Sequence, residues 1–71
     1  MENIKEGTKI RVVRGDIDTV IHDPYGVVRN IKPNGQCEIH LNYGRGIYFE
    51  WDINKIGIGQ DIELFDWKNS E

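Results

Sequence analysis

Residues 26–43 read GVVRNIKPNGQCEIHLNY, and this stretch decides the fold. Apolar and polar side chains alternate on both sides of Pro33-Asn34-Gly35. Proline presets φ for a turn, and the Asn-Gly pair accepts positive φ. Alternation with a period of two places every second side chain on one face of a strand. The stretch therefore predicts an antiparallel β-hairpin in which Cys37, Ile39 and Leu41 face inward.

The same pattern of short alternating runs, each ending at a glycine, continues on both sides of this hairpin. It predicts three further strands, over residues 8–14, 47–51 and 61–65. Ile10 and Val12 should point inward in the first of them. Five strands joined by short connections predict an all-β domain, a small closed barrel of five antiparallel strands.

Two segments interrupt the alternation. Residues 52–57 carry Asp where a helix cap sits and Gly where a helix stops, which predicts one turn of 3₁₀-helix before the last strand. Residues 15–24 are too long for a hairpin turn, so they predict a long first loop with three aspartates and three aliphatic residues. If Ile17 stays exposed beside Asp16 and Asp18, this loop is a contact surface, and otherwise it is a folded flap.

Length and composition predict one domain, residues 1–71, with an ordered core at about 7–67. A chain of 71 residues cannot both fill a core and surround a deep cavity, so its working surface should be a shallow groove, a loop or a sheet edge. The single cysteine, Cys37, excludes an intrachain disulfide and falls at an inward position. The beginning of the chain lacks the basic and apolar regions of a signal peptide, and no apolar run approaches membrane-spanning length. We therefore expect a cytoplasmic protein that does not bind membranes.

The order of these elements resembles that of the SH3-like barrels. Within that group, residues 6–41 are most similar to KOW or Tudor-like domains. The run from Glu6 to Gly15 resembles the opening pattern G-D-x-V-x-V-x-x-G, and Gly26 to Ile31 resembles the following G-x-V-x-x-I. KOW-type domains occur in ribosomal and transcription proteins, so the resemblance implies contact with RNA or polymerase. This chain departs from the pattern in its net charge of −3 and its aspartate-rich first loop.

Residues that carry chemistry do not form a recognisable catalytic or metal-binding pattern. The chain has no Ser-His-Asp grouping and no phosphate-cradling glycine motif. His22, His40 and Cys37 lack the spacing of a zinc site, and the aspartates of the first loop lack the glycine and final glutamate of a calcium loop. We expect neither an enzyme, nor a metal site, nor a cofactor.

The function we expect is binding of another protein by a small regulatory module. Exposed aromatic side chains are favoured anchors, because they bury much area at low entropic cost. Alternation predicts that Phe49 and Trp51 face inward. It places Tyr25, Tyr48 and Trp67 outside the barrel or at its ends. The alternative is that the barrel's open ends are simply closed by Trp67 and Tyr43. The expected anchors are Tyr25, Tyr48, Trp51 and Trp67, with Asp16, Asp18 and Arg45 giving orientation.

The alternative function is nucleic-acid binding through the outer face of the first two strands. Residues 1–45 hold seven lysines and arginines against six carboxylates, whereas residues 46–71 hold two against six. A cluster of Lys9, Arg11, Arg29 and Lys32 would favour this function, and an even mixture of signs there would count against it. Self-association through a sheet edge stays open as a third interpretation.

Overall fold

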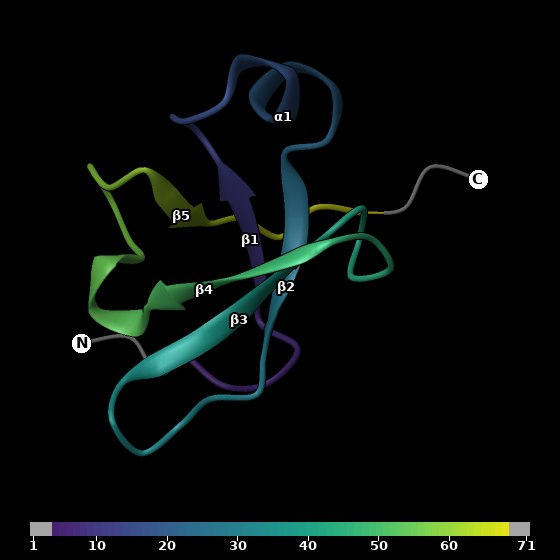
Figure 1. The fold of residues 1–71 in the computed structure, drawn as a ribbon. Coiled ribbons are helices and arrows are strands. Elements are labelled where there is room, and N and C mark those ends of the chain that lie inside the picture. The colour runs from purple at the N-terminus through teal and green to yellow at the C-terminus, as the bar shows by residue number, and fades with distance from the viewer. Residues whose placement is uncertain (1–3, 69–71) are drawn as a thin grey trace.

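Five antiparallel strands form one strongly curled sheet in the computed structural model of the chain, which describes residues 4–68 (Figure 1). The strands are β1 (Lys9–Val12), β2 (Tyr25–Arg29), β3 (Gln36–Leu41), β4 (Tyr48–Asp52) and β5 (Ile62–Leu64). A short helix, α1 (Ile17–His22), follows β1, and a 3₁₀-helix, η1 (Ile53–Lys55), precedes β5. Residues 1–3 and 69–71, which flank the predicted ordered core of about residues 7–67, lie outside the described range.

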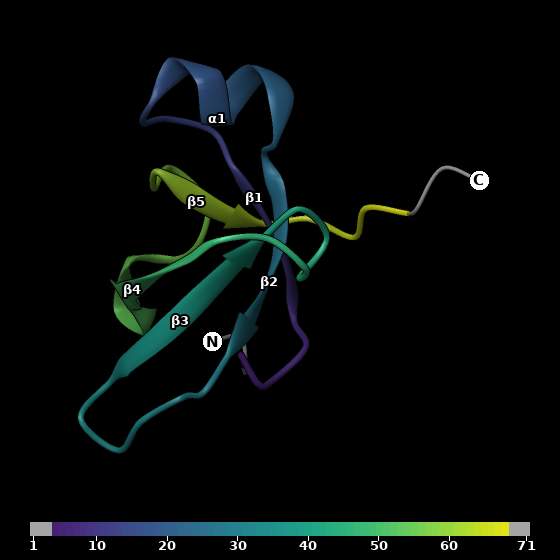
Figure 2. The same ribbon diagram turned by 45° about the vertical axis from the view of Figure 1, so that its right-hand side comes forward.

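The sheet is a half-barrel rather than a closed barrel (Figure 2). Its strand order is β4-β3-β2-β1-β5, so β4 and β5 are its two edges. The far side of β5 is occupied by a parallel bridge between Ile56 and Ile62, where the Gly57 amide donates to the Ile62 carbonyl at 2.9 Å. The predicted strands and the 3₁₀ turn before the last strand are confirmed, but the sheet stays open because the segment after η1, not β4, pairs with β5.

The core is built by the alternation that the sequence predicts. In β1, Ile10 and Val12 are buried, and in β3 every second residue, Cys37, Ile39 and Leu41, is buried. Val28 and Ile62 complete this cluster from β2 and β5. Phe49 and Trp51 of β4 are half-buried and pack against it, as their alternation predicts. One face of the curled sheet is therefore the core face, and we call the other the outer face.

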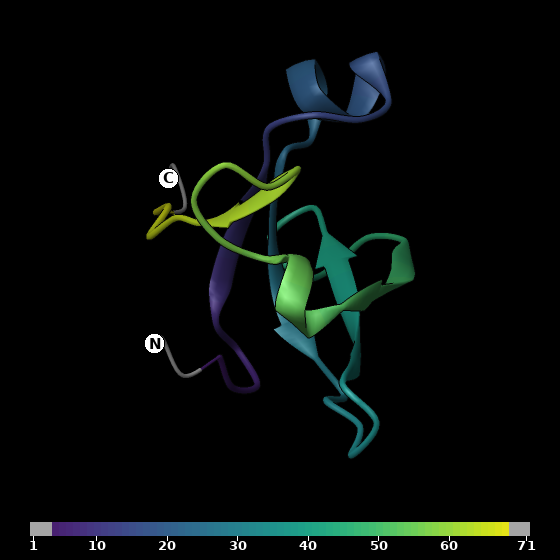
Figure 3. The same ribbon diagram turned by 90° about the vertical axis from the view of Figure 1, so that its left-hand side faces the viewer.

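The predicted loop at residues 15–24 contains a helix that sequence patterning missed. The Asp16 carboxylate caps α1 by accepting a hydrogen bond from the Thr19 amide at 3.3 Å. Val20 packs against the core, while Ile17 and Ile21, one helical turn apart, are 70% and 62% exposed. Figure 3 shows α1 standing at one end of the half-barrel. Ile17 thus stays exposed beside Asp16 and Asp18, and that this segment is a contact surface stays a prediction.

After β5 the chain continues across the β1–β2 pair, as the last part of the ribbon shows (Figure 1). Trp67 at the end of this crossing is buried, with 6% of its surface exposed. Its indole N–H donates a hydrogen bond of 2.9 Å to the carbonyl of Gly26 in β2. Trp67 is therefore not an exposed side chain outside the barrel, because the segment after β5 packs its ring onto the sheet.

Candidate functional site

The hairpin between β3 and β4 brings two large apolar side chains to the surface together. Its loop is closed by two hydrogen bonds, from the Gly46 amide to the Leu41 carbonyl at 2.8 Å and from the Leu41 amide to the Ile47 carbonyl at 3.0 Å. Within the loop, Asn42 and Tyr43 adopt positive φ. This geometry delivers Ile47 and Tyr48 to the start of β4, where they are 77% and 58% exposed.

The ring of Tyr48 is exposed and yet held in place. The strand register sets His40 of β3 opposite Tyr48 of β4, and their rings stack with centroids 4.7 Å apart and an interplanar angle of 10°. The imidazole Nε2 of His40 lies 2.9 Å from Oε1 of Glu38, and the Asn30 side chain donates to Oε2 of the same carboxylate at 2.9 Å. The His40 imidazole, on which Tyr48 stacks, is therefore held by Glu38, and Glu38 is held in turn by Asn30.

Electrostatics on this face are dominated by carboxylates. The two strands β3 and β4 carry Glu38, Glu50 and Asp52 but no lysine or arginine. The hydrogen bond from Asn30 and then that from His40 lower the pKa of Glu38, so this group stays ionised. Lys32, which precedes β3, donates to Oε2 of Glu50 at 2.9 Å, and this hydrogen bond raises the pKa of Lys32.

The four predicted aromatic anchors do not gather on one surface. Tyr25 stacks on Phe65 with centroids 5.6 Å apart, within the crossing of the C-terminal segment. Trp67 is buried in the same crossing, with its ring edge-on to Tyr43 at 4.8 Å. Trp51 faces the core side, and its indole N–H donates to the Lys55 carbonyl at 3.2 Å. Tyr48 alone among these four aromatic residues projects from the sheet.

The three predicted orienting residues are divided between two places. Asp16 caps α1, where its carboxylate is also 3.4 Å from the Thr19 hydroxyl, and Asp18 is exposed in the first turn of that helix. Arg45 is exposed in the β3–β4 loop, where its amide donates to the Asn42 carbonyl at 3.0 Å. Arg45 therefore belongs to the hairpin of Tyr48, and the aspartates belong to the helix.

The four basic residues of the alternative function do not form a cluster of one sign. Lys9 lies 3.6 Å from Asp66, Arg11 lies 2.6 Å from Glu63, and Lys32 pairs with Glu50 as described above. Arg29 is exposed but faces Glu38 in the register of β2 and β3. Lys9 also donates to the Trp67 carbonyl at 2.9 Å and lies over the indole ring. The outer face of β1 and β2 thus carries mixed charges, and the C-terminal segment crosses it.

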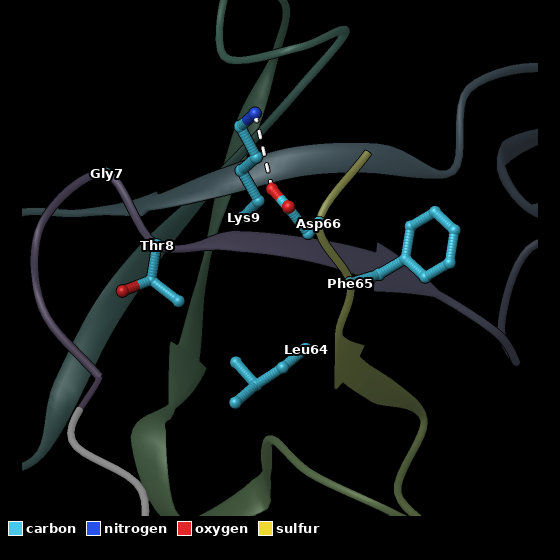
Figure 4. A pocket seen from close by; sticks show the side chains of 6 residues that line it. All are labelled: Gly7, Thr8, Lys9, Leu64, Phe65 and Asp66. Atoms are coloured by element: carbon cyan, nitrogen blue, oxygen red, sulfur yellow. Dashed lines mark ion pairs between the residues drawn. The ribbon is translucent and has the colours of Figure 1, made fainter. Parts of the chain in front are cut away.

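A shallow pocket of about 460 Å³ lies between the start of β1 and the end of β5 (Figure 4). Its lining residues are Gly7, Thr8, Lys9, Leu64, Phe65 and Asp66. The ammonium group of Lys9 points to the Asp66 carboxylate, so the pocket's two charged groups neutralise each other. Across residues 4–68, no three His, Cys, Asp or Glu side chains come together as metal ligands.

Ile47 and His40 are the site residues that sequence reasoning missed. Alternation correctly placed His40 in an outward polar row beside Glu38, but it contained no information on which residue of the next strand lies opposite. The signal for Ile47 was its position directly after the Gly44-Arg45-Gly46 turn, where an apolar residue at the tip of a hairpin is exposed.

No protein-family model, no curated protein and no solved structure matches this chain. Within the described part of the chain, no helix has the length and apolar character needed to cross a membrane.

Proposed function

We propose that this chain is a small cytoplasmic module that binds another protein and performs no catalysis, and that the hairpin surface around Tyr48 is its binding site. The observation that carries the proposal is the stack of Tyr48 on His40, which presents an exposed aromatic ring in a fixed orientation. A ring that is already held loses little further freedom when a partner covers it. Ile47 beside it extends the apolar area that a partner would bury.

The surroundings of Tyr48 match the usual composition of a protein-binding surface. Binding hot spots are enriched in tyrosine and lie inside a rim of polar groups. Glu38, Glu50 and Lys32 supply such a rim on the same face, while Arg45 lies in the adjoining loop. The hairpin therefore combines an apolar centre with charged neighbours that set orientation.

The finer assignment of the fold also belongs to this proposal. We propose that the half-barrel is an SH3-like domain, because a long first connection, a three-stranded meander and a 3₁₀ turn before the last strand follow one another in that order. Among small barrels, this architecture is used mainly as a scaffold for binding loops and edges, and its function depends on the site that it displays.

Replacing Tyr48 tests the proposed function. The parent protein and Tyr48→Ala are each immobilised, and proteins captured from lysate of the source organism are quantified by mass spectrometry. We expect the partner of the parent protein to be captured roughly 30-fold less well, which corresponds to about 2 kcal/mol at a hot spot. Circular dichroism should show an unchanged fold, because the altered ring is exposed.

Ile58→Ala is the matched control, since Ile58 is also an exposed apolar residue but lies in the loop before β5. It should capture the same partner as the parent protein does. Equal capture by the parent and by Tyr48→Ala would show that the binding surface lies elsewhere.

A further inference from the structure

The outer edge of β4 presents unpaired backbone groups. Two hydrogen bonds to β3 frame the strand, from the Leu41 amide to the Ile47 carbonyl at 3.0 Å and from the Ile53 amide to the Gly35 carbonyl at 2.9 Å. In an antiparallel pair, residues that bond to the neighbouring strand alternate with residues that point their N–H and C=O groups away from it. The odd-numbered residues of β4 therefore bond to β3, and Tyr48, Glu50 and Asp52 direct their backbone groups outward.

Apart from the Asp52 carbonyl, which accepts the first hydrogen bond of η1, these outward groups meet no backbone partner within residues 4–68, because β4 ends the strand order and the segment after η1 pairs with β5 instead. An unpaired edge with its donors and acceptors in line is a template for one more strand. The edge borders the exposed pair Ile47 and Tyr48, so a strand added here would also contact the proposed anchor.

We propose that β4 is the docking edge for an extended segment of a partner protein, in which lysine or arginine faces Glu50 and alternate apolar residues face the core side. This inference rests on the protein-binding function proposed above and names its mode and its partner chemistry. The added strand would become the sixth of the sheet and continue the curl of the half-barrel.

Charge selects a basic segment over an acidic one. On the outer face, β3 and β4 themselves contribute three carboxylates and no lysine or arginine, and Lys32 reaches Glu50 from the segment before β3. Lys32 occupies Oε2 of Glu50, and Oε1 of that carboxylate has no partner in the described part of the chain. Opposite charges directly across a strand pair are favourable, whereas like charges there are unfavourable. A lysine or arginine on the added strand could therefore pair with the remaining carboxylate oxygen, Oε1, of Glu50.

The same charge argues against a second copy of this chain as the occupant. Antiparallel pairing of two β4 strands about their centres would set Glu50 of one copy opposite Glu50 of the other. Such a pair of carboxylates would repel at the middle of the new interface.

The core side of β4 calls for apolar residues on the incoming strand. Phe49 and Trp51 point to that side, and both are only half-buried, with their rings edge-on at 5.8 Å. Neighbouring side chains on one face of a sheet pack against each other. Apolar residues at alternate positions of the added strand would cover the remaining exposed area of these two rings. The fitting sequence is therefore an alternation of basic and apolar residues.

The test is an amide NMR titration of the full chain with a capped peptide in which lysine alternates with valine. A peptide with glutamate in place of every lysine is the matched control. We expect the lysine peptide to shift the amide signals of Tyr48, Glu50 and Asp52, whose N–H groups would gain hydrogen bonds. Their hydrogen exchange should slow about tenfold when the peptide is present at about ten times its Kd. The glutamate peptide should leave these signals unchanged.

Three substitutions at Glu50 separate backbone pairing from charge. Glu50→Pro removes an outward N–H without removing a bond to β3, and proline is tolerated on edge strands at such positions. It should abolish the shifts, while Glu50→Gln, which keeps the N–H, should retain weaker ones. Glu50→Lys should reverse the preference and bind the glutamate peptide, so the proposal remains testable even if Glu50→Pro does not fold.

Three results would overturn the proposal. The first is the absence of shifts along β4 with the lysine peptide at low millimolar concentration, and the second is equal shifts with both peptides. The third is slower exchange in β4 that depends on protein concentration alone, which would identify a second copy as the occupant. If any one of these results occurs while Tyr48→Ala still loses the captured partner, the proposed function stands and only the added strand is excluded.

Discussion

The indole N–H of Trp67 donates a 2.9 Å hydrogen bond to the backbone carbonyl of Gly26, across 41 positions of sequence. This contact attaches the segment after β5 to the face of the sheet opposite the core. Tyr43 packs edge-on against the same indole at 4.8 Å, and Lys9 lies 4.6 Å above its centre. Aromatic and cationic neighbours thus form a second packed cluster, which adds to a core of limited size.

Removing the Trp67 side chain should destabilise the whole domain. Trp67→Ala should lower the free energy of unfolding by about 3–5 kcal/mol. Trp67→Phe keeps an aromatic ring but loses the hydrogen bond, and this loss should lower the free energy of unfolding by about 1 kcal/mol beyond the effect of the smaller ring. Urea denaturation followed by circular dichroism measures both. Ile58→Ala should change the free energy by less than about 0.5 kcal/mol, as an exposed control. An unchanged midpoint for Trp67→Ala would mean that the C-terminal segment contributes nothing to stability.

Gly26 should not tolerate even a methyl group. A Cβ at this position would lie 2.3 Å from the His40 carbonyl oxygen, at the pairing of β2 with β3. Because the atom that this Cβ would meet belongs to the backbone of the paired strand, Gly26→Ala should cost about 3 kcal/mol or more. Gly57→Ala is the comparison: its Cβ would meet no atom within 4 Å, so only the positive φ opposes it, at about 1–2 kcal/mol. Thermal unfolding should rank the two variants in this order, and the reverse order would contradict the close approach of the strands.

Glu38 should make stability depend on acid pH. Its folded-state pKa is lowered, first by the hydrogen bond from Asn30 and then by that from His40. The stabilisation is therefore fully present above the unfolded pKa of about 4.3 and is lost as pH falls through the lower folded value. The difference in urea midpoint between the parent and Glu38→Gln should shrink across that window. A difference that stays constant with pH would show that the ionised carboxylate is not the stabilising form.

Cys37 should be unreactive in the folded protein. Its side chain is fully buried on the core face of β3, and burial raises the pKa of the thiol. Since the thiolate is the reactive form, an aromatic disulfide reagent should label Cys37 at the rate at which the domain opens. Labelling in guanidinium chloride, where the thiol is accessible, provides the control. Rapid labelling under native conditions would indicate that β3 is exposed far more often than the packing implies.

Part of the proposed binding site could be predicted from the sequence, and part could not. Alternation placed Tyr48 and His40 on the outer face, and the glycine turn marked the hairpin that carries them. The stack between these two rings depends on which residues of β3 and β4 lie opposite, and a shift of one position would send each side chain to the other face. The same applies to the basic residues: Lys9, Arg11 and Lys32 are separate in sequence from the carboxylates that neutralise them.

The sequence by itself determined the strands, their inward faces and the turns, because these follow from the period of two and from the local conformational preferences of glycine, proline and asparagine. Only the tertiary structure decided that α1 forms behind the Asp16 cap, that Trp67 returns to the outer face, and that β4 remains an open edge. The position of Trp67 and the open edge depend on contacts between residues far apart in the chain, and α1 adds to its local cap the packing of Val20 on the core. Local pattern carries no information about such contacts, since their free energy appears only when the strands have assembled.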